Sequence, residues 1–307
     1  MCQTPQITYI IVTWNNEKEI FNCLDSIKNN TNCDFDIFVV DNASRDGTIA
    51  ICNKFDFVTL IKSDKNLGFA EANNIALSKV KTKYVCFLNP DVILFEDIVK
   101  PQIFVLENEH DVGLTSCRLL NSDFSFQKSY SNYTTPLNIF LEILHFGQIV
   151  PNFLRKKYFQ SYYKCCEQFN PDWVIGAEMM MRTTEAKQLG GFSEGYFMYT
   201  EDMDLCMKVH KMLGKSVRYI PGVSLVHLGG ASEVQNISYK KQNKIFENLK
   251  KFSKKFYDNN GNALLVSAMS AALIRGLLLK LFYFKNDRQE QISKTYKLWL
   301  SAKYSLF

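Results

Sequence analysis

The sequence predicts an α/β fold built on a mostly parallel sheet, followed by a C-terminal helical extension. Short β-rich runs alternate with helical patterns over roughly the first ninety residues. This alternation is typical of a parallel sheet with helices on both faces, in which ligands bind at the carboxyl ends of the strands. The chain has 307 residues, of which 47% are hydrophobic and 22% charged. That composition supports a large core and argues against disorder.

Four strands and the helices between them are expected in this first part of the chain. The strands are expected at residues 7–13, 35–40, 57–61 and 84–88. The helices are indicated by Ile20, Leu24 and Ile27 on one face, by Ile49, Cys52 and Phe55, and by the turn 66–74, which opens a helix running to Val80. Asp41 and Asp91 follow the second and fourth strands, so both are expected at the ligand-binding edge of the sheet.

The loops after these strands exclude two familiar nucleotide sites. No G-x-G-x-x-G follows the first strand, and no G-x-x-x-x-G-K-[ST] occurs in the chain. Asp41 can accept a hydrogen bond from a nucleobase N–H, and Gly68 would let the backbone approach a ribose or phosphate. Ordinary turn chemistry also explains residues 41–48, since Asp, Asn, Ser and Gly are common in turns.

Asp91 and His227 are candidates for a metal site. Asp91 follows a buried strand and Pro90, while His227 ends another apolar strand before a Gly-Gly turn. A carboxylate, an imidazole, diphosphate oxygens and water would suit Mn²⁺ or Mg²⁺ in octahedral geometry. A structural role for the lone histidine is the alternative.

A third candidate region holds three carboxylates within four residues. Glu201, Asp202 and Asp204 precede a helical pattern that begins near Thr200. Acids in the first turn of a helix suit its positive end, so stabilisation of the helix is one interpretation. The other is a general base beside a cleft, because Gly195 and several aromatic residues lie directly before the acids.

Taken in order, these motifs resemble the family 2 nucleotide-sugar glycosyltransferases of the GT-A fold, in particular their rhamnosyltransferase-like branch. The resemblance covers roughly residues 7 to 232. The matching pieces are Val12-Thr13-Trp14-Asn15, Val40-Asp41-Asn42-Ala43-Ser44, Asp46-Gly47-Thr48, Asn66-Leu67-Gly68-Phe69-Ala70, Asn73-Asn74, Leu88-Asn89-Pro90-Asp91, Asp172-Trp173-Val174, Gly176-Ala177, Gly190-Gly191-Phe192 and Glu201-Asp202-Met203-Asp204-Leu205.

The resemblance implies a role for each candidate residue. Asp202 would be the catalytic base, with Glu201 orienting substrate hydroxyls, while Asp91 and His227 would hold Mn²⁺ or Mg²⁺. The donor nucleotide-sugar would be bound by Thr13, Asn15, Asp41, Gly68, Asn73, Trp173, Gly176 and Ala177. One departure is visible, because Asn89 replaces the first acid of the family's D-x-D motif and leaves the metal one carboxylate short.

The implied reaction is a single displacement with inversion, from dTDP-rhamnose or a UDP-sugar to a lipid-linked or polysaccharide acceptor, in surface-polysaccharide assembly. No Q-x-x-R-W motif of processive relatives follows Thr-Glu-Asp, so we expect one sugar per acceptor. Two alternatives are a non-catalytic carbohydrate-binding or scaffold protein and a sugar nucleotidyltransferase. The latter should carry a Gly-rich, Arg-bearing loop where this chain has residues 13–16.

We expect a catalytic domain over residues 1–235 and a helical tail over 236–307. Within the first, residues 124–171 interleave aromatic and basic side chains and are expected to form an acceptor-side insert; the chain's net charge of only +5 and the absence of a recognised motif argue against nucleic acid. The tail begins with a basic amphipathic helix, which predicts contact with an anionic membrane surface or packing on protein.

The remaining expectations concern the tail and the compartment. Residues 263–279 are apolar but interrupted by Arg275, so a helix in the interface or a buried helix is favoured over a spanning one. A homodimer through the C-terminal helices is a further expectation. Scattered cysteines without a C-x-x-C pair and the lack of an export signal favour a cytoplasmic protein, peripheral on the membrane's cytoplasmic face.

Overall fold

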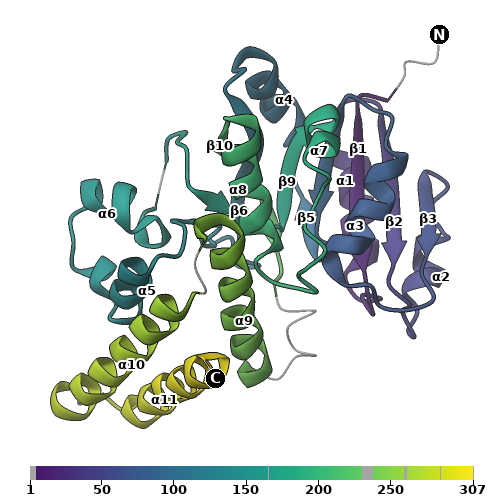
Figure 1. Ribbon diagram of the computed structural model, residues 1–307. Helices are drawn as coiled ribbons and strands as arrows, with labels where there is room; N and C mark the ends of the chain where they lie inside the picture. Colours follow the sequence, from purple (N-terminus) through teal and green to yellow (C-terminus); the bar gives the residue numbers. More distant parts are fainter. Residues whose placement is uncertain (1–4, 165, 230–237, 259–260, 284, 307) are drawn as a thin grey trace. The chain divides into compact units, whose positions relative to one another are not determined.

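The computed structural model describes residues 5–164, 166–229, 238–258, 261–283 and 285–306. The chain forms two compact units, shown in Figure 1. The first, here called the sheet unit, contains Met1–Tyr130 and Cys165–Gln235. The second, the helical unit, contains Ser131–Lys164 and Asn236–Phe307. Each unit is described by itself.

The sheet unit is built on one eight-stranded sheet with the strand order β3-β2-β1-β4-β9-β6-β10-β5. Its strands are β1 Ile7–Thr13, β2 Phe35–Asp41, β3 Val58–Lys62, β4 Tyr84–Leu88, β5 Val92–Leu94, β6 Val112–Leu120, β9 Glu178–Arg182 and β10 Ser216–His227. The predicted first and fourth strands are confirmed at both ends, and the second and third to within one residue. A separate two-stranded sheet pairs β7 Tyr130–Ser131 with β8 Trp173–Val174.

The first four strands are parallel, as predicted, and their register aligns the residues that follow them. Thr13 pairs with Asp41 at the ends of β1 and β2, and Ile11 pairs with Leu88 at the end of β4. The later strands make the sheet mixed, because β9 runs antiparallel to β4 and β6, and β5 antiparallel to β10. The loops after β1, β2 and β4 therefore meet at one edge.

Six helices accompany this sheet in the described part of the unit. They are α1 Ile20–Asn30, α2 Thr48–Cys52, α3 Gly68–Lys79, α4 Val99–Asn108, α7 Thr183–Gln188 and α8 Glu201–Leu213. The predicted face of α1 is confirmed, since Ile20, Leu24 and Ile27 are fully buried in one core with Tyr9 of β1. Strand β1 is buried along nearly its whole length, as expected for a strand covered on both faces.

The loops after β1 and β2 are tied to each other by backbone and side-chain hydrogen bonds. The Asn42 N–H donates to the Thr13 carbonyl at 2.8 Å, and the Asn15 N–H donates to Ser44 Oγ at 2.9 Å. In return Asn15 Oδ1 accepts from the Arg45 N–H at 2.8 Å. These bonds hold Thr13 and Asn42 at fixed positions on the sheet edge.

The helical unit confirms the predicted C-terminal helical extension. Its elements are α5 Pro136–Ile143, η1 Phe146–Gln148, α6 Asn152–Tyr158, η2 Gln160–Tyr162, α9 Ser238–Tyr257, α10 Asn262–Phe282 and α11 Arg288–Leu306. Helix α10 packs against α5 and α11, and the Arg275 guanidinium donates to the Ile143 carbonyl at 2.9 Å. The unit thus combines most of the predicted insert with the tail. The predicted boundary near residue 235 and the acceptor role of the insert stay predictions.

Candidate active site

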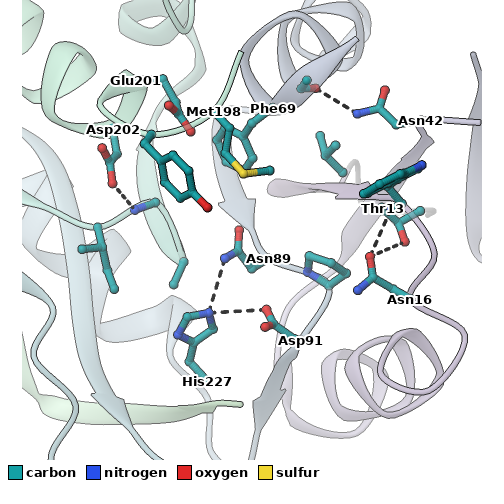
Figure 2. Close-up of a pocket in the computed structure, with 18 of the residues that line it drawn as sticks. Thr13, Asn16, Asn42, Phe69, Asn89, Asp91, Met198, Glu201, Asp202 and His227 are labelled. Atoms are coloured by element: carbon teal, nitrogen blue, oxygen red, sulfur yellow. Dashed lines mark hydrogen bonds and ion pairs between the residues drawn. The ribbon is translucent and has the colours of Figure 1, made fainter. Parts of the chain in front are cut away.

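A cavity of about 290 Å³ lies within the sheet unit at the carboxyl edge of the sheet (Figure 2). Its walls come from the loops after β1, β2, β3 and β4, the turn between β8 and β9, the start of α8 and the end of β10. The lining residues are Val12, Thr13, Trp14, Asn16, Asn42, Asn66, Gly68, Phe69, Asn89, Pro90, Asp91, Ile175, Gly176, Ala177, Met198, Tyr199, Glu201, Asp202 and His227.

Eight of the residues predicted for the site line this cavity. They are Thr13, Gly68, Asp91, Gly176, Ala177, Glu201, Asp202 and His227. Figure 2 shows Glu201 and Asp202 together on one side, Thr13, Asn16 and Asn42 on the opposite side, and Asn89, Asp91 and His227 grouped below. The structure thus gathers residues that lie more than two hundred positions apart in the chain.

The other four predicted residues do not line it. Asn15 joins the two loops described above, and Asn73 is buried with its amide donating to the Phe69 carbonyl at 2.9 Å. Trp173 lies in β8 and is half-buried. Asp41 is buried, and its Oδ2 accepts from the Ser44 N–H at 3.0 Å. Its Oδ1 is buried and meets no hydrogen-bond partner among the residues that the structure describes.

Asparagines supply most of the polar lining that sequence reasoning did not single out. Asn16 Oδ1 accepts from the Thr13 hydroxyl at 3.2 Å and from the Trp14 N–H at 3.0 Å. Asn42 Nδ2 donates to the Gly68 carbonyl at 2.9 Å, and Asn66 Oδ1 accepts from the Gly68 N–H at 2.9 Å. These side chains shape the loops by bonding their backbones. Asn42 and Asn66 lie inside the matched motifs and Asn16 directly follows the first of them, which was the signal that could have identified them.

The glycine at position 68 is required by the loop that precedes α8. Gly68 has φ +83°, and a Cβ there would lie 2.4 Å from the Phe197 carbonyl oxygen. The neighbouring Phe69 N–H donates to the same carbonyl at 3.1 Å. An added side chain would therefore displace the 195–200 loop, which carries Met198 and Tyr199 into the cavity wall. The close approach that the structure shows at Gly68 is between two parts of the protein.

Asp202 is held at the N-terminus of α8 by two backbone donors. Its Oδ2 accepts from the Gly176 N–H at 3.1 Å and its Oδ1 from the Met203 N–H at 2.7 Å. Burial raises the pKa of the Asp202 carboxyl, and these two N–H donors counteract part of that rise. Tyr199 and Thr200, directly before the helix, both adopt left-handed backbone conformations with φ 71° and 80°. Such strain is typical of functional sites.

The three acids at the start of α8 have different surroundings. The helix begins at Glu201, as predicted, and Thr200 makes no side-chain cap. Asp204 is fully buried and accepts hydrogen bonds from the Ser193 and Tyr196 hydroxyls, so it anchors the preceding loop. Glu201 is buried at the cavity wall, and Asp202 faces the cavity while bonded to Gly176. The acids of this first turn therefore suit the positive end of the helix, and two of them, Glu201 and Asp202, also line the site.

The metal candidates lie together at the bottom of the cavity. His227 Nε2 is 3.4 Å from Asp91 Oδ1 and 3.4 Å from Asn89 Nδ2. His227 Nδ1 is 2.7 Å from Gln127 Oε1. Neighbouring ligands of an octahedral ion with bonds of about 2.1 Å lie about 3.0 Å apart, which is close to the Asp91–His227 separation. No group of three or more His, Cys, Asp or Glu suited to a metal occurs among the described residues.

The chain is similar to known glycosyltransferases. The model of the family described as Glycosyl transferase family 2 matches residues 8–174. Rhamnosyltransferase WbbL of Escherichia coli K12 is 28% identical over 232 residues, which cover 72% of this chain and 83% of that protein. The N-acetylglucosaminyl-diphospho-decaprenol L-rhamnosyltransferase of Mycobacterium tuberculosis is 23% identical over 241 residues, covering 73% of this chain and 76% of that protein.

A solved structure extends the similarity to the fold. The mannosyltransferase PcManGT from Pyrobaculum calidifontis, in complex with GDP-Man and Mn²⁺, superposes with a TM-score of 0.63 at 16% identity, covering 99% of this chain and 88% of that one. The GT-A fold and the family predicted from the sequence are confirmed. The chain belongs to glycosyl transferase family 2.

Proposed function

We propose that this glycosyltransferase moves a single sugar, with inversion, from a nucleoside-diphosphate donor to a hydroxyl of a lipid-linked or polysaccharide acceptor in surface-polysaccharide assembly. One observation carries the proposal: Asp202 and the Asp91–His227 pair line the same cavity at the edge of the sheet. The first group can take a proton from the acceptor, and the second can act on the departing diphosphate. dTDP-rhamnose or a UDP-sugar is the proposed donor, and the rhamnosyltransferase relatives support rhamnose.

The nucleotide would bind across the loops after β1 and β2. The Thr13 hydroxyl lies at the cavity wall, and the buried Asp41 Oδ1 meets no hydrogen-bond partner among the described residues. A buried acceptor without a partner is costly. Because Asp41 does not line the cavity, a nucleobase N–H would reach this oxygen only if the loop after β2 rearranged. Gly176 has no side chain and Ala177 only a methyl group, so this part of the wall leaves room for the donor sugar.

Mn²⁺ or Mg²⁺ is the proposed cofactor, held by Asp91 and His227. A bound divalent ion would offset the negative charge that develops on the departing diphosphate. Two protein ligands leave most coordination positions to phosphate oxygens and water, as is usual for ions that act on nucleotides. The Asn89 amide beside His227 Nε2 adds no charge, so the ion depends more on the donor diphosphate than it would with a second carboxylate.

Asp202 is the proposed general base. Hydrogen bonds from Gly176 and Met203 leave both carboxylate oxygens oriented, and burial raises the pKa toward the range useful for proton abstraction. The proton of the acceptor hydroxyl would pass to the carboxylate as the oxygen attacks the sugar carbon. The bond to the diphosphate breaks on the opposite side, which gives inversion. Glu201, buried at the same wall, is proposed to orient hydroxyl groups.

The first prediction concerns this base. We expect Asp202→Asn to lower transfer by about 10² to 10⁴-fold while donor affinity, measured by calorimetry, changes little. In the wild type, kcat/KM should fall as the pH drops through a pKa above the ordinary aspartate value of about 3.9, because burial raises it and only the carboxylate accepts a proton.

The matched control is Asp64→Asn, an exposed acid outside the cavity lining, which should transfer sugar like the wild type. An Asp202→Asn variant that keeps more than a tenth of the wild-type turnover would remove Asp202 from the role of base.

A second prediction concerns the metal. Asp91→Ala and His227→Ala should each weaken donor binding when Mn²⁺ is present and have little effect in chelator, because their contribution passes through the ion to the diphosphate. Calorimetry with the nucleoside diphosphate alone measures this without turnover. If the wild type bound the nucleotide equally well with and without Mn²⁺, the metal site would be refuted.

A further inference from the structure

Large apolar side chains are exposed mainly in the helical unit. Of the 22 exposed large hydrophobic residues in the described chain, 15 lie in this unit, which holds only about a third of the sequence. A soluble monomer rarely exposes so many together, and such surfaces commonly mark contact with a partner or a membrane. The helical unit therefore carries the exposed apolar surface that is typical of contact with a partner or a membrane.

Helix α10 carries the longest of these exposed surfaces. Its outer face, defined here by Val266, Leu273, Leu277 and Leu281, is 50%, 55%, 60% and 61% exposed at these residues. Their spacing of seven, four and four places them on one side of the helix. On the other side Leu265, Ala268 and Ala272 are buried, and α10 packs there against α5 and α11. The helix is thus apolar on both sides, although its own unit covers only one.

The two units carry formal charges of opposite sign. The helical unit contains 18 Lys and Arg residues against 5 Asp and Glu, a formal charge of +13. Since the whole chain carries +5, the sheet unit carries −8. At the C-terminal end of α10 the exposed side chain of Lys280 is followed by that of Lys285. An apolar face on a strongly basic unit suits a surface that is apolar and anionic at once.

We propose that the helical unit docks on an anionic phospholipid bilayer through the outer face of α10, with this helix lying along the interface. Lys280 and Lys285 would face the headgroups. Basic residues near an anionic surface are attracted to it, and the exposed leucines add apolar burial. The charge of +13 favours a bilayer over a dimer that joins two helical units face to face, because these two units would repel each other.

The orientation along the interface follows from how α10 is held. This helix is long and apolar enough to cross a membrane by length and composition. However, Arg275 in its middle donates to the Ile143 carbonyl at 2.9 Å, and Ser267 Oγ donates to the Pro136 carbonyl at 2.5 Å. Crossing the bilayer would require breaking the packing on α5 and α11. Helix α9 contributes mainly lysines, because Phe252, on its apolar side, is fully buried and Tyr257 at its end is only 37% exposed.

This inference rests on the proposed function in one respect, the choice of a lipid-linked acceptor, whose sugar would be presented at the bilayer surface. Binding to vesicles needs no sugar transfer, and hydrolysis of the donor needs no membrane. A failure of docking and a failure of the proposed chemistry are therefore distinguishable.

The test is flotation of the full-length chain with vesicles of phosphatidylcholine, alone or mixed with phosphatidylglycerol. We expect binding only to the mixed vesicles and weaker binding in high salt. The triple variant Leu273→Ser, Leu277→Ser and Leu281→Ser should lose at least about tenfold in vesicle affinity, since three exposed apolar side chains are removed. A control pair, Phe104→Ser and Met212→Ser, changes side chains of the sheet unit that are 67% and 58% exposed and should bind like the wild type.

Four results would overturn the proposal. The first is a wild type that does not bind anionic vesicles, and the second is a triple variant that binds them like the wild type. The third is protein that stays in the vesicles after alkaline carbonate, which would indicate a spanning helix. The fourth is a wild-type dimer that is lost in the triple variant. Circular dichroism checks that the triple variant is folded. If it is not, Lys280→Gln with Lys285→Gln provides a second variant, which should weaken binding at low salt only; unchanged binding at low salt would also contradict the proposal.

A separate observation concerns Gln127, which holds the metal candidate His227. Gln127 Nε2 donates to the His227 carbonyl and to Asn121 Oδ1, each at 3.0 Å. Both partners can only accept, so Gln127 Oε1 must face His227 Nδ1, 2.7 Å away. An amide oxygen cannot donate, so Nδ1 carries the proton. The lone pair of neutral His227 is therefore on Nε2, the nitrogen 3.4 Å from Asp91.

We infer that Gln127 is a positioning residue that fixes this tautomer and aims Nε2 at the ion. The inference rests on the proposed metal site. Loss of such a partner typically lowers metal affinity by about 10 to 100-fold. Gln127→Leu should do so. Gln127→Glu keeps an acceptor for the Nδ1 proton but loses the donor to the His227 carbonyl, so it should lower the affinity less than Gln127→Leu does. Electron paramagnetic resonance of free Mn²⁺, with nucleoside diphosphate present, measures the affinity.

Nitrogen-15 resonances of the ring, recorded without metal or nucleotide, measure the tautomer independently. The wild type should show the Nδ1 proton form at His227, and Gln127→Leu a mixture. Gln148→Leu is the matched control, since Gln148 Nε2 lies 3.1 Å from His145 Nδ1, outside the cavity lining. An unchanged tautomer in Gln127→Leu would refute the positioning role; a changed tautomer with unchanged Mn²⁺ affinity would refute its connection to the ion.

Discussion

The parallel register of β1, β2 and β4 is the constraint on which the rest of the site depends. It aligns the ends of the three strands, so that the residues after Thr13, Asp41 and Leu88 meet at one edge of the sheet. Hydrogen bonds between the first two loops then fix that edge. Asp91 then lies beside His227 because β5 pairs with β10, with Val92 opposite His227 and the Leu228 N–H donating to the Asp91 carbonyl at 2.9 Å. The placement of the site is thus decided by backbone pairing, before any ligand binds.

The opposite wall depends on one close contact between distant parts of the chain. The Phe197 carbonyl lies against Gly68 and accepts from the Phe69 N–H, which holds the strained turn before α8. That turn and the Gly176 N–H together set where the Asp202 carboxylate points. Gly68 at the start of α3 and Asp202 in α8 are therefore linked at one site, although they lie far apart in the sequence. This packing holds the proposed base, so a substitution of Gly68 should change the position of the Asp202 carboxylate.

Much of the fold could be predicted from the sequence, because β1 to β4 are short apolar runs with polar ends. The antiparallel strands β9 and β5 could not, since their pairing is decided by tertiary contacts. Among site residues, Asp91, His227 and Asp202 stood out by chemistry and motif. Asn16, Asn42 and Asn66 did not, because asparagine in a loop is equally well explained by turn geometry. The exposure of the outer face of α10 could not be predicted either, because a pattern of apolar residues does not indicate which side of the helix packs on other elements.

Asp202 and the Asp91–His227 pair are proposed to act on opposite ends of one displacement. The anomeric configuration of the transferred sugar tests this most directly. Proton NMR of the product, made with a donor of known configuration and a soluble acceptor, should show one sugar added with inverted configuration. A product with retained configuration would contradict this mechanism, because retention requires a second displacement and a nucleophile on the other side of the sugar.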